Sequence, residues 1–283
     1  NDIDFTPAND GQVILIEGDA DGNLGPVEDR FTSDTAIQDA IDSEDADADD
    51  VVAVAPGTFD EQITIDKSLT LLGPNAGIAG DSQARSGDEA SITAPNQTTG
   101  STVSIEADGV TFDGFELDPQ GDASNGIAVA PGSDNANVVN NVVTGVSGGF
   151  QPVGILVGSE PDGTKTTIDS VNVSRNKIVD LDPGGGDSVH AIQFLSGDDE
   201  ITNAQINDNA IGGIKANTND RARGIQLDVN DPDGSIETVS IDGNTISADV
   251  SGSRGFALEG KFAGGLVFTE NGDNGPTDLT VTS

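Results

Sequence analysis

Short segments that alternate apolar and polar residues recur through the second half of the chain. They are 126–129, 154–157, 191–194, 224–227 and 255–258. Their first apolar residues are Ile127, Ile155, Ile192, Ile225 and Phe256, and their second are Val129, Val157, Phe194, Leu227 and Leu258. A period of two places both sets on one face of an extended strand. We therefore predict five short strands that share a buried face.

A second family of segments precedes these strands, and each member consists of two short strands that meet at a bend. The members are 111–117, 137–143, 172–178, 205–211 and 240–246. In the last four, the bend carries Asn141, Asn176, Asn209 and Asn244, at spacings of 35, 33 and 35 residues. Asn tolerates left-handed backbone geometry, and its amide can bond the next Asn in a stack. We predict a structural Asn ladder rather than a catalytic set, because a residue that repeats with the fold belongs to the scaffold.

Recurring short strands predict the fold class. Singly they cannot bury an apolar face, but they can when the chain coils and the coils stack. We predict an all-β fold, a right-handed parallel β-helix (a solenoid), with a rise of about 4.8 Å per coil. Because stacking extends a single core, the 283 residues fit one elongated domain at 33–283, preceded by an arm at 1–32.

Both ends of such a coil need closure, because they expose apolar interior and unpaired strand edges. Near the start, Ser33 or Asp34 can N-cap a short capping helix over 34–42, whose apolar residues share one face. Terminal strands are expected after residue 261, at 264–269 and 279–282. In the arm, Gln12 to Glu17 forms a strand outside the repeat, which can pair with a neighbouring subunit by β-strand addition.

The net charge of the chain indicates the environment in which it works and excludes some classes of partner. Fifty Asp and Glu residues stand against eleven Lys and Arg, for a net charge of −39. Such a charge repels itself, and molar salt relieves the repulsion by shrinking the screening length to about 3 Å. We expect a halophilic, archaeal source. Nucleic acid and anionic lipid are excluded as partners, since both are bound through basic patches.

Several features predict secretion. The longest apolar runs, 13–16 and 51–55, are too short to span a membrane, so no membrane insertion is expected. The numbering starts at Asn1 without Met, as removal of a signal peptide would leave it. We expect an extracellular or cell-surface protein, and the sequons at Asn96 and Asn172 are candidate glycosylation sites. The chain has no Cys, so packing and hydrogen bonds must stabilise it.

Three stretches near the start resemble the opening of proteins with the pectin-lyase-like β-helix fold. They are AIQDAID at 36–42, VVAVAPGTF at 51–59 and EQITIDKSLTLLG at 61–73. The later repeats are similar to the parallel β-helix repeats of carbohydrate-binding and sugar-hydrolase domains, so the resemblance covers residues of about 34–260. It implies the fold but no activity, because the catalytic strings of pectin methylesterases and polygalacturonases do not occur here.

Residues that flank the alternating strands form the most enzyme-like cluster. Asp228 and Glu259 would be neighbours on adjacent coils, roughly 5 Å apart. Two carboxylates at that separation can serve retaining glycoside hydrolysis, and His190, Arg223 and Arg254 would hold an acidic sugar beside them. The alternative is cross-coil ion pairing, which also places acids and arginines side by side on an acidic surface. We favour ion pairing.

The segment Asp19-Ala-Asp-Gly-Asn23 has alternating oxygen ligands, with Glu28 beyond it, and is a candidate Ca²⁺ loop formed by Asp19, Asp21, Asn23 and Glu28. It departs from an EF-hand, since Leu24 stands where that loop requires Gly and Arg30 where it requires Glu. A solvated turn is the alternative. We expect no cofactor other than this Ca²⁺.

The sequence thus predicts a non-catalytic, extracellular structural subunit of a halophile's surface assembly, which self-associates into a filament, surface layer or adhesive appendage. A secreted polysaccharide lyase or hydrolase, or a carbohydrate-binding module, stays open as the alternative, because the same coil hosts such proteins. A viral spike or turret is the second alternative. Polysaccharide is therefore a candidate partner besides a second copy of the chain.

Overall fold

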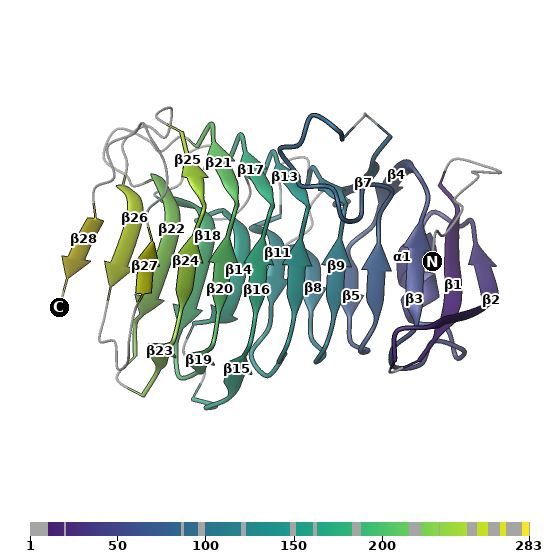
Figure 1. Cartoon of the computed structure of the whole chain (residues 1–283), viewed down its shortest axis with the longest axis horizontal. Coiled ribbons are helices and arrows are strands. Elements are labelled where there is room, and N and C mark those ends of the chain that lie inside the picture. The colour runs from purple at the N-terminus through teal and green to yellow at the C-terminus, as the bar shows by residue number, and fades with distance from the viewer. Residues whose placement is uncertain are drawn as a thin grey trace.

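Parallel β-sheets run along almost the whole length of the molecule (Figure 1). The computed structural model describes residues 11–19, 21–85, 88–95, 100–119, 123–147, 151–160, 163–182, 188–214, 222–231 and 233–247, and the strand backbone at 254–259, 267–269 and 279–282. Over these residues the fold is all-β, as predicted, and its only helix is α1 (Ala36–Ile41).

Four sheets contain the strands, and each is given in its spatial order. Sheet A consists of β2 (Leu24–Phe31), β1 (Val13–Gly18), β3 (Val51–Val54), β6 (Thr70–Leu72), β9 (Thr111–Asp113), β12 (Asn137–Val139), β16 (Asn172–Ser174), β20 (Gln205–Asn207), β24 (Ser240–Asp242) and β27 (Val267–Thr269). Sheet B consists of β4 (Gly57–Asp60), β7 (Ala90–Thr93), β10 (Glu116–Leu117), β13 (Val142–Thr144), β17 (Lys177–Val179), β21 (Ala210–Gly212) and β25 (Thr245–Ile246). Sheet C consists of β5 (Ile63–Ile65), β8 (Ser101–Ile105), β11 (Asn125–Val129), β14 (Val153–Ser159), β18 (Val189–Ser196), β22 (Ala222–Val229), β26 (Arg254–Glu259) and β28 (Leu279–Thr282). The small sheet D consists of β15 (Thr167–Asp169), β19 (Glu200–Thr202) and β23 (Ser235–Glu237).

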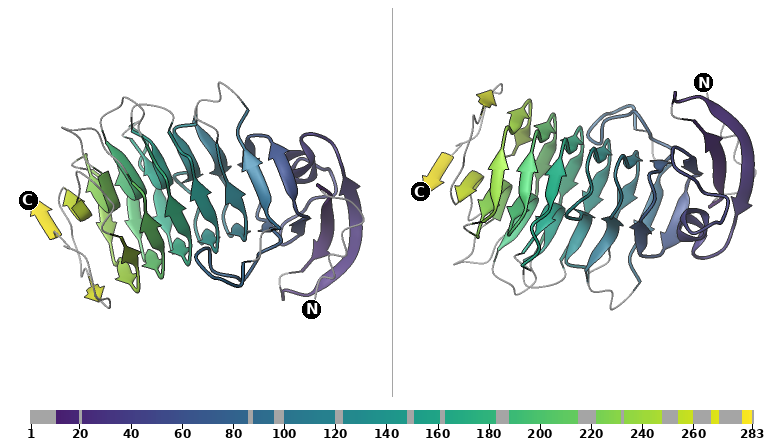
Figure 2. Two further views of the ribbon diagram at one scale, coloured as in Figure 1. Left: turned by 90° about the horizontal axis from the view of Figure 1, so that it is seen from above. Right: turned by 90° about the horizontal axis from the view of Figure 1, so that it is seen from below.

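The chain visits the sheets in a fixed cycle. It passes from β9 in sheet A to β10 in sheet B and β11 in sheet C, and then returns to sheet A with β12. Each strand of sheets A, B and C from β9 to β25 pairs in parallel with its counterpart one circuit earlier, as Val138 of β12 does with Phe112 of β9. Successive circuits are therefore stacked along the long axis, as the views from above and below show (Figure 2).

The alternating segments lie in register in sheet C, as their pattern predicts. Ile127 aligns with Ile155, Ile155 with Ile192, and Ile192 with Ile225. All four side chains are buried, and they belong to a single hydrophobic core that extends from the first circuits to Val239. Period-two alternation has this outcome because alternate side chains of a strand lie on opposite faces, and one face of these strands lies against the core.

The four predicted asparagines form one column at the bend between sheets A and B. The Nδ2 atoms of Asn141 and Asn176 donate to the backbone oxygens of Phe112 and Val138, at 3.0 and 2.8 Å. Their Oδ1 atoms accept from the backbone amides of Phe115 and Asn141, also at the bend, at 3.0 and 2.9 Å. Both side chains are buried, so the ladder satisfies polar backbone groups that water does not reach.

The left-handed backbone conformation lies one residue before the ladder and not at the ladder itself, which corrects the expectation from sequence. Gly114, Asn140, Arg175, Asp208 and Gly243 have φ between 55° and 84°. The ladder asparagines are not among the residues with positive φ. The turn therefore needs its left-handed residue first, and the next position is chosen for the hydrogen bonds of its side chain.

Helix α1 covers the N-terminal end of the core, where Ala36, Ile37, Ala40 and Ile41 are buried. Its N-cap position is occupied by Thr35, which makes no side-chain cap, and not by Ser33 or Asp34 as predicted. The carboxylate of Glu61 accepts hydrogen bonds from the amides of Ile37 and Gln38 instead, at 3.1 and 2.9 Å. The cap comes from a distant strand connection, so local sequence could not identify it.

The strand predicted at Gln12 to Glu17 is β1, and it lies inside sheet A. It pairs antiparallel with β3 on one side and with β2 on the other. Val13 and Leu15 face the main core, whereas Ile16 packs with Val51 and Ala53 on the opposite face. Because both of its edges are hydrogen-bonded, β1 cannot accept a strand from a neighbouring subunit, and the outer strand at this end is β2.

Candidate functional site

The structure brings together part of the enzyme-like cluster on sheet C. His190 of β18 and Arg223 of β22 are paired in register, with Arg223 Nη1 3.5 Å from His190 Nε2. Arg223 Nη1 also donates to Gln226 Oε1 at 3.1 Å, and Gln226 Nε2 donates to Asp228 Oδ2 at 3.0 Å. The four residues thus form a hydrogen-bonded row along two strands. The row includes Gln226, which the sequence pattern did not single out.

Burial removes three of these four residues from contact with a ligand. His190, Arg223 and Gln226 are 0 %, 6 % and 1 % exposed, although the strand register places His190 and Arg223 on the outward side. Burial, and then the charge of Arg223, lower the pKa of His190 to about 3. His190 is therefore neutral at pH 7, and because its side chain is fully buried it offers an acidic sugar neither a positive charge nor an accessible donor, which corrects the role predicted for it.

The predicted acid pair is only partly described. The backbones of Asp228 and Glu259 are aligned across β22 and β26, as are those of Arg223 and Arg254. The side chains of Glu259 and Arg254 lie outside the described residues. Asp228 accepts a hydrogen bond from Gln226, which ties its carboxylate to the buried row.

The candidate Ca²⁺ loop is the turn between β1 and β2. The Asp19 carboxylate accepts hydrogen bonds from the amides of Asp21 and Asn23, at 3.0 and 2.9 Å. It also accepts two from Asn23 Nδ2, at 3.1 and 3.0 Å, while Glu28 lies farther along β2. The hydrogen bond from the Asn23 amide, first among the causes, lowers the pKa of Asp19. In the described part of the chain, no group of three or more His, Cys, Asp or Glu residues is arranged to hold a metal ion.

Only one of the two sequons lies within the described residues. Asn96 lies outside the described residues. Asn172 begins β16, where its Nδ2 donates to Asn137 Oδ1 at 3.3 Å and its side chain is half-buried. Glycosylation at either position stays a prediction.

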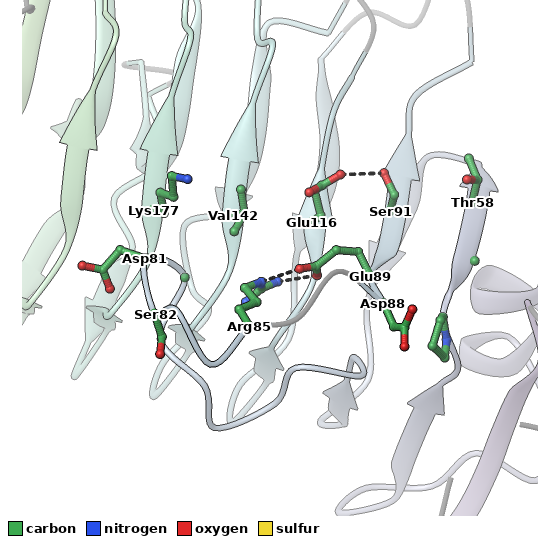
Figure 3. Close-up of a pocket in the computed structure, with 13 residues that line it drawn as sticks. Thr58, Asp81, Ser82, Arg85, Asp88, Glu89, Ser91, Glu116, Val142 and Lys177 are labelled. Carbon is green, nitrogen blue, oxygen red and sulfur yellow. Dashed lines mark hydrogen bonds and ion pairs between the residues drawn. The ribbon is translucent and has the colours of Figure 1, made fainter. Parts of the chain in front are cut away.

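A groove that sequence patterns did not indicate lies on sheet B (Figure 3). Its floor is a row of outward residues in register across five strands, namely Thr58, Ser91, Glu116, Val142 and Lys177. Its opposite wall is formed by the described residues of the connection from β6 to β7, 73–85 and 88–89, which we call the strap. The cavity between floor and strap has a volume of about 840 Å³.

The strap is packed directly against the bend between sheets A and B. The amide of Gly80 donates to the backbone oxygen of Arg175 at 2.9 Å. A Cβ atom at Gly80 would lie 2.5 Å from the oxygen of Asn141 and 2.7 Å from the amide of Lys177. Only glycine permits this approach, so the strap's position over sheet B depends on Gly80.

Arg85 anchors the strap. Its Nε and Nη2 atoms donate to the two carboxylate oxygens of Glu89, each at 2.7 Å. Its Nη1 and Nη2 atoms also donate to the backbone oxygens of Asn140 and Phe115, at 2.6 and 2.9 Å. The Arg85 side chain is only 5 % exposed. A bidentate, buried pair of this kind fixes geometry, and its charges are largely satisfied within the protein.

Glu116 has fewer partners than Glu89. Its Oε1 atom accepts a hydrogen bond from Ser91 Oγ at 3.3 Å, and the side chain is half-buried at the groove floor. Burial, followed by the charge of Glu89, raises the pKa of Glu116, and Ser91 and Arg85 offset only part of this rise. Glu116 is thus a carboxyl group that faces the cavity without a strong partner for its charge.

The groove lining is mostly polar. Thr58, Ser82 and Ser91 supply hydroxyl groups, and Asp81 and Asp88 supply further carboxylates at the strap. Val142 and Pro56 add small apolar areas. Such a surface can both donate and accept hydrogen bonds along the molecular axis, which suits a hydroxyl-rich ligand. The sequence pattern missed it because the strap interrupts the repeat, although Arg85 and Glu89 at a spacing of four were a signal.

Comparisons of the chain with family models, curated proteins and solved structures found no match. The resemblance to pectin-lyase-like proteins therefore stays a prediction. In the described residues, no helix is long and apolar enough to cross a membrane.

Proposed function

We propose that this chain is an extracellular, non-catalytic, carbohydrate-binding right-handed parallel β-helix of a halophilic organism. The observation that carries the proposal is the groove between the strap and sheet B, with its row of hydroxyl, carboxylate and ammonium groups. This is the carbohydrate-binding alternative that the sequence left open. The groove favours it over a purely structural role.

The fold supports the β-helix interpretation. Sheets A, B and C are visited in turn, and every counterpart strand from β9 to β25 is parallel. Crossovers between parallel strands of one sheet are right-handed in about 98% of cases, because twisted strands pack back onto the sheet in that way. The same rule applied to each circuit here favours the right-handed form.

The dimensions of the groove fit a short stretch of polysaccharide. Five strands spaced about 4.8 Å apart make its floor about 19 Å long. Sugar hydroxyl groups can donate to Glu116 and Asp88 and accept from Lys177 and Ser91, which all line the cavity. The chain has no Trp or Tyr, so hydrogen bonds and not stacking would provide most of the affinity.

Binding without cleavage suits the carboxylates of the groove. A glycosidase needs one carboxyl group as an acid and a second as a free base or nucleophile. Both carboxylate oxygens of Glu89 accept hydrogen bonds from Arg85. Glu89, the charged group with the largest effect on the pKa of Glu116, is therefore not a free base or nucleophile. The groove therefore supports recognition better than hydrolysis.

The test is binding of a panel of neutral, acidic and amine-bearing oligosaccharides, measured by calorimetry in molar NaCl. Ser91→Phe fills the floor of the groove and should abolish binding. Thr245→Phe adds the same ring to the same outward row of sheet B, but on β25, beyond the groove, and should leave binding unchanged. Failure of every oligosaccharide to bind, or equal effects of the two substitutions, would refute the proposal.

A self-associating structural subunit is the second candidate, and β2 is the observation that favours it. This strand forms one edge of sheet A, and its central residues are exposed on both faces. Val27, at 44 %, is the exposed large hydrophobic residue of the described chain. Pairing of β2 between two copies would bury it, although Pro26 and Glu28 are residues that protect edges from such pairing. Light scattering in molar NaCl compares the native chain with Val27→Lys. This candidate requires that the native chain assembles and that the variant does not.

A further inference from the structure

We propose that the groove selects a glycan carrying free amino groups, a hexosamine oligomer, by placing a ligand ammonium group against the Glu116 carboxylate. This inference rests on the proposed carbohydrate-binding function and names the class of sugar that the site takes. It follows from the charges of the lining, the partners of Glu116 and the distance to Lys177.

The groove has an excess of negative charge. Its lining holds four carboxylates, those of Asp81, Asp88, Glu89 and Glu116, against the two cations of Arg85 and Lys177. Arg85 donates hydrogen bonds to Glu89 and to three backbone oxygens, so little of its charge reaches a ligand. An acidic sugar would add another negative charge to this lining, whereas an amine would offset one.

Glu116 is the carboxylate best placed to accept the amine. It lies in the middle of the five-residue floor, half-buried, with the Ser91 hydroxyl 3.3 Å away. The burial and the nearby Glu89 that raise its pKa both disfavour its charged form. A ligand ammonium group would supply the missing positive charge and three hydrogen-bond donors.

Lys177 does not supply the positive charge that Glu116 lacks. It is separated from Glu116 in the row by Val142, so the two positions are about 10 Å apart at 4.8 Å per strand. Molar salt screens exposed charges beyond about 3 Å. Lys177 can therefore contact a different part of the ligand, such as a ring or hydroxyl oxygen, while Glu116 accepts the amine.

High salt makes the half-buried position of Glu116 important. Long-range attraction between an acidic surface and a cationic glycan is lost in molar NaCl, because exposed charges are screened. A direct contact at a partly desolvated carboxylate is screened much less. Discrimination between amine-bearing and neutral sugars should therefore persist in molar salt if it depends on Glu116.

The test compares glucosamine oligomers with N-acetylglucosamine, neutral glucose and galacturonate oligomers, by calorimetry in molar NaCl at neutral pH. The glucosamine oligomer should bind about tenfold more tightly than the N-acetylated one, as one charge-assisted hydrogen bond implies. Glu116→Gln should remove that difference and leave binding of the N-acetylated oligomer within about twofold. Glu237→Gln, the same change on sheet D, should preserve the tenfold preference, and circular dichroism would verify that both variants fold.

The possible outcomes distinguish selection of an amine-bearing sugar from carbohydrate binding in general. Binding of neutral or N-acetylated oligomers with no preference for the amine would overturn the inference and leave carbohydrate binding intact. So would a galacturonate preference, or an equal loss for every oligomer in Glu116→Gln. Absence of binding by all four oligomers would overturn both proposals.

Discussion

The backbone amide of Asn141 donates to the side-chain oxygen of Asn176 one circuit away, at 2.9 Å. The same relationship joins Asn176 to Asn209 at 3.0 Å and Asn209 to Asn244 at 2.9 Å. The bend between sheets A and B turns these amides away from ordinary strand partners. The ladder supplies partners in the buried interior, where an unsatisfied amide would be costly.

Removal of one ladder side chain should therefore destabilise the fold. In Asn176→Ala, the amide of Asn141 loses its acceptor and the oxygen of Val138 loses its donor. Each buried group left without a partner costs about 1–3 kcal/mol, so we expect a loss of about 3 kcal/mol in unfolding free energy. Denaturant titration measures it. The exposed position Gln205→Ala is the control, with an expected change under about 0.5 kcal/mol, and equal effects of both substitutions would contradict the role of the ladder.

Arg85 should control the position of the strap. Arg85→Ala removes the Arg85 donors from the oxygen of Asn140 and the carboxylate of Glu89, whereas the oxygen of Phe115 keeps the hydrogen bond from the amide of Val142. With the Arg85 side chain only 5 % exposed, we expect a loss of about 2–4 kcal/mol. Arg85→Lys keeps the charge but not the two-pronged geometry, so its loss should be intermediate.

The consequence for the strap can be measured locally. A broad-specificity protease should cleave within residues 73–85 faster in Arg85→Ala than in the native chain, because local opening exposes the backbone. Circuits far from the strap should keep their protection. Unchanged cleavage of the strap would show that Gly80 and the strap's other contacts hold it without Arg85.

The stacked circuits were predictable from sequence because each carries the same local pattern. Ile155 and Ile192 keep step with the turns around them, so their period of two is enough to identify the buried face. The ladder followed from the spacing of identical asparagines. The left-handed position was misplaced by one residue, because spacing alone does not separate the residue that turns from the residue that bonds.

Features outside the repeat were the ones that sequence missed. Strand β2 contains Pro26 and several charges and has no buried face, so no alternation marks it. The strap lacks a counterpart in other circuits, and its contacts with Asn140 and Arg175 join residues far apart in the chain. Alternation also distinguishes only the inside of a coil from its outside. It could not show that His190 and Arg223, on the outside, are buried.

Mild acid should stabilise the N-terminal cap. Burial, the largest cause, raises the pKa of Glu61 above 4.5, although the amides of Gln38 and Ile37 oppose this shift. A carboxyl group whose pKa is higher in the folded state contributes stability below its unfolded pKa, and loses it as pH rises through the folded pKa. Burial also raises the pKa of Asp113 and Glu116, so they act in the same direction.

Thermal unfolding in molar NaCl from pH 8 down to pH 5 should therefore show a melting temperature that rises relative to that of Glu61→Gln, because the variant cannot titrate at that position. His190 acts in the opposite direction in both proteins, since its lowered pKa favours the unfolded state below about pH 6.5, so the difference between the two proteins isolates Glu61. Glu200→Gln is the control, a partly exposed acid on sheet D that should leave the dependence unchanged. Equal changes of the melting temperature with pH in the native chain and in Glu61→Gln would contradict stabilisation by protonation of the Glu61 carboxyl group.

Salt should stabilise the whole fold, because like charges are spread along the chain. The net charge of −39 comes from fifty acidic residues against eleven basic ones. Even if every Lys and Arg paired with an acid, as Arg85 does with Glu89, most carboxylates would have no cationic partner. Repulsion between the remaining carboxylates is therefore offset by solvent ions more than by partners in the protein.

Lowering NaCl from molar concentrations toward about 0.1 M lengthens the screening distance from about 3 to about 10 Å. Adjacent circuits are separated by about 4.8 Å, so acids on neighbouring circuits begin to repel one another. We expect the melting temperature to fall across this range, and to fall less at pH 5 than at pH 8 because some carboxylates are then protonated. Replacing NaCl with an equal osmolarity of sucrose controls for solvent exclusion, since sucrose does not screen charge. A melting temperature that is unchanged with salt, or that sucrose restores fully, would show that charge repulsion does not limit the stability of this coil.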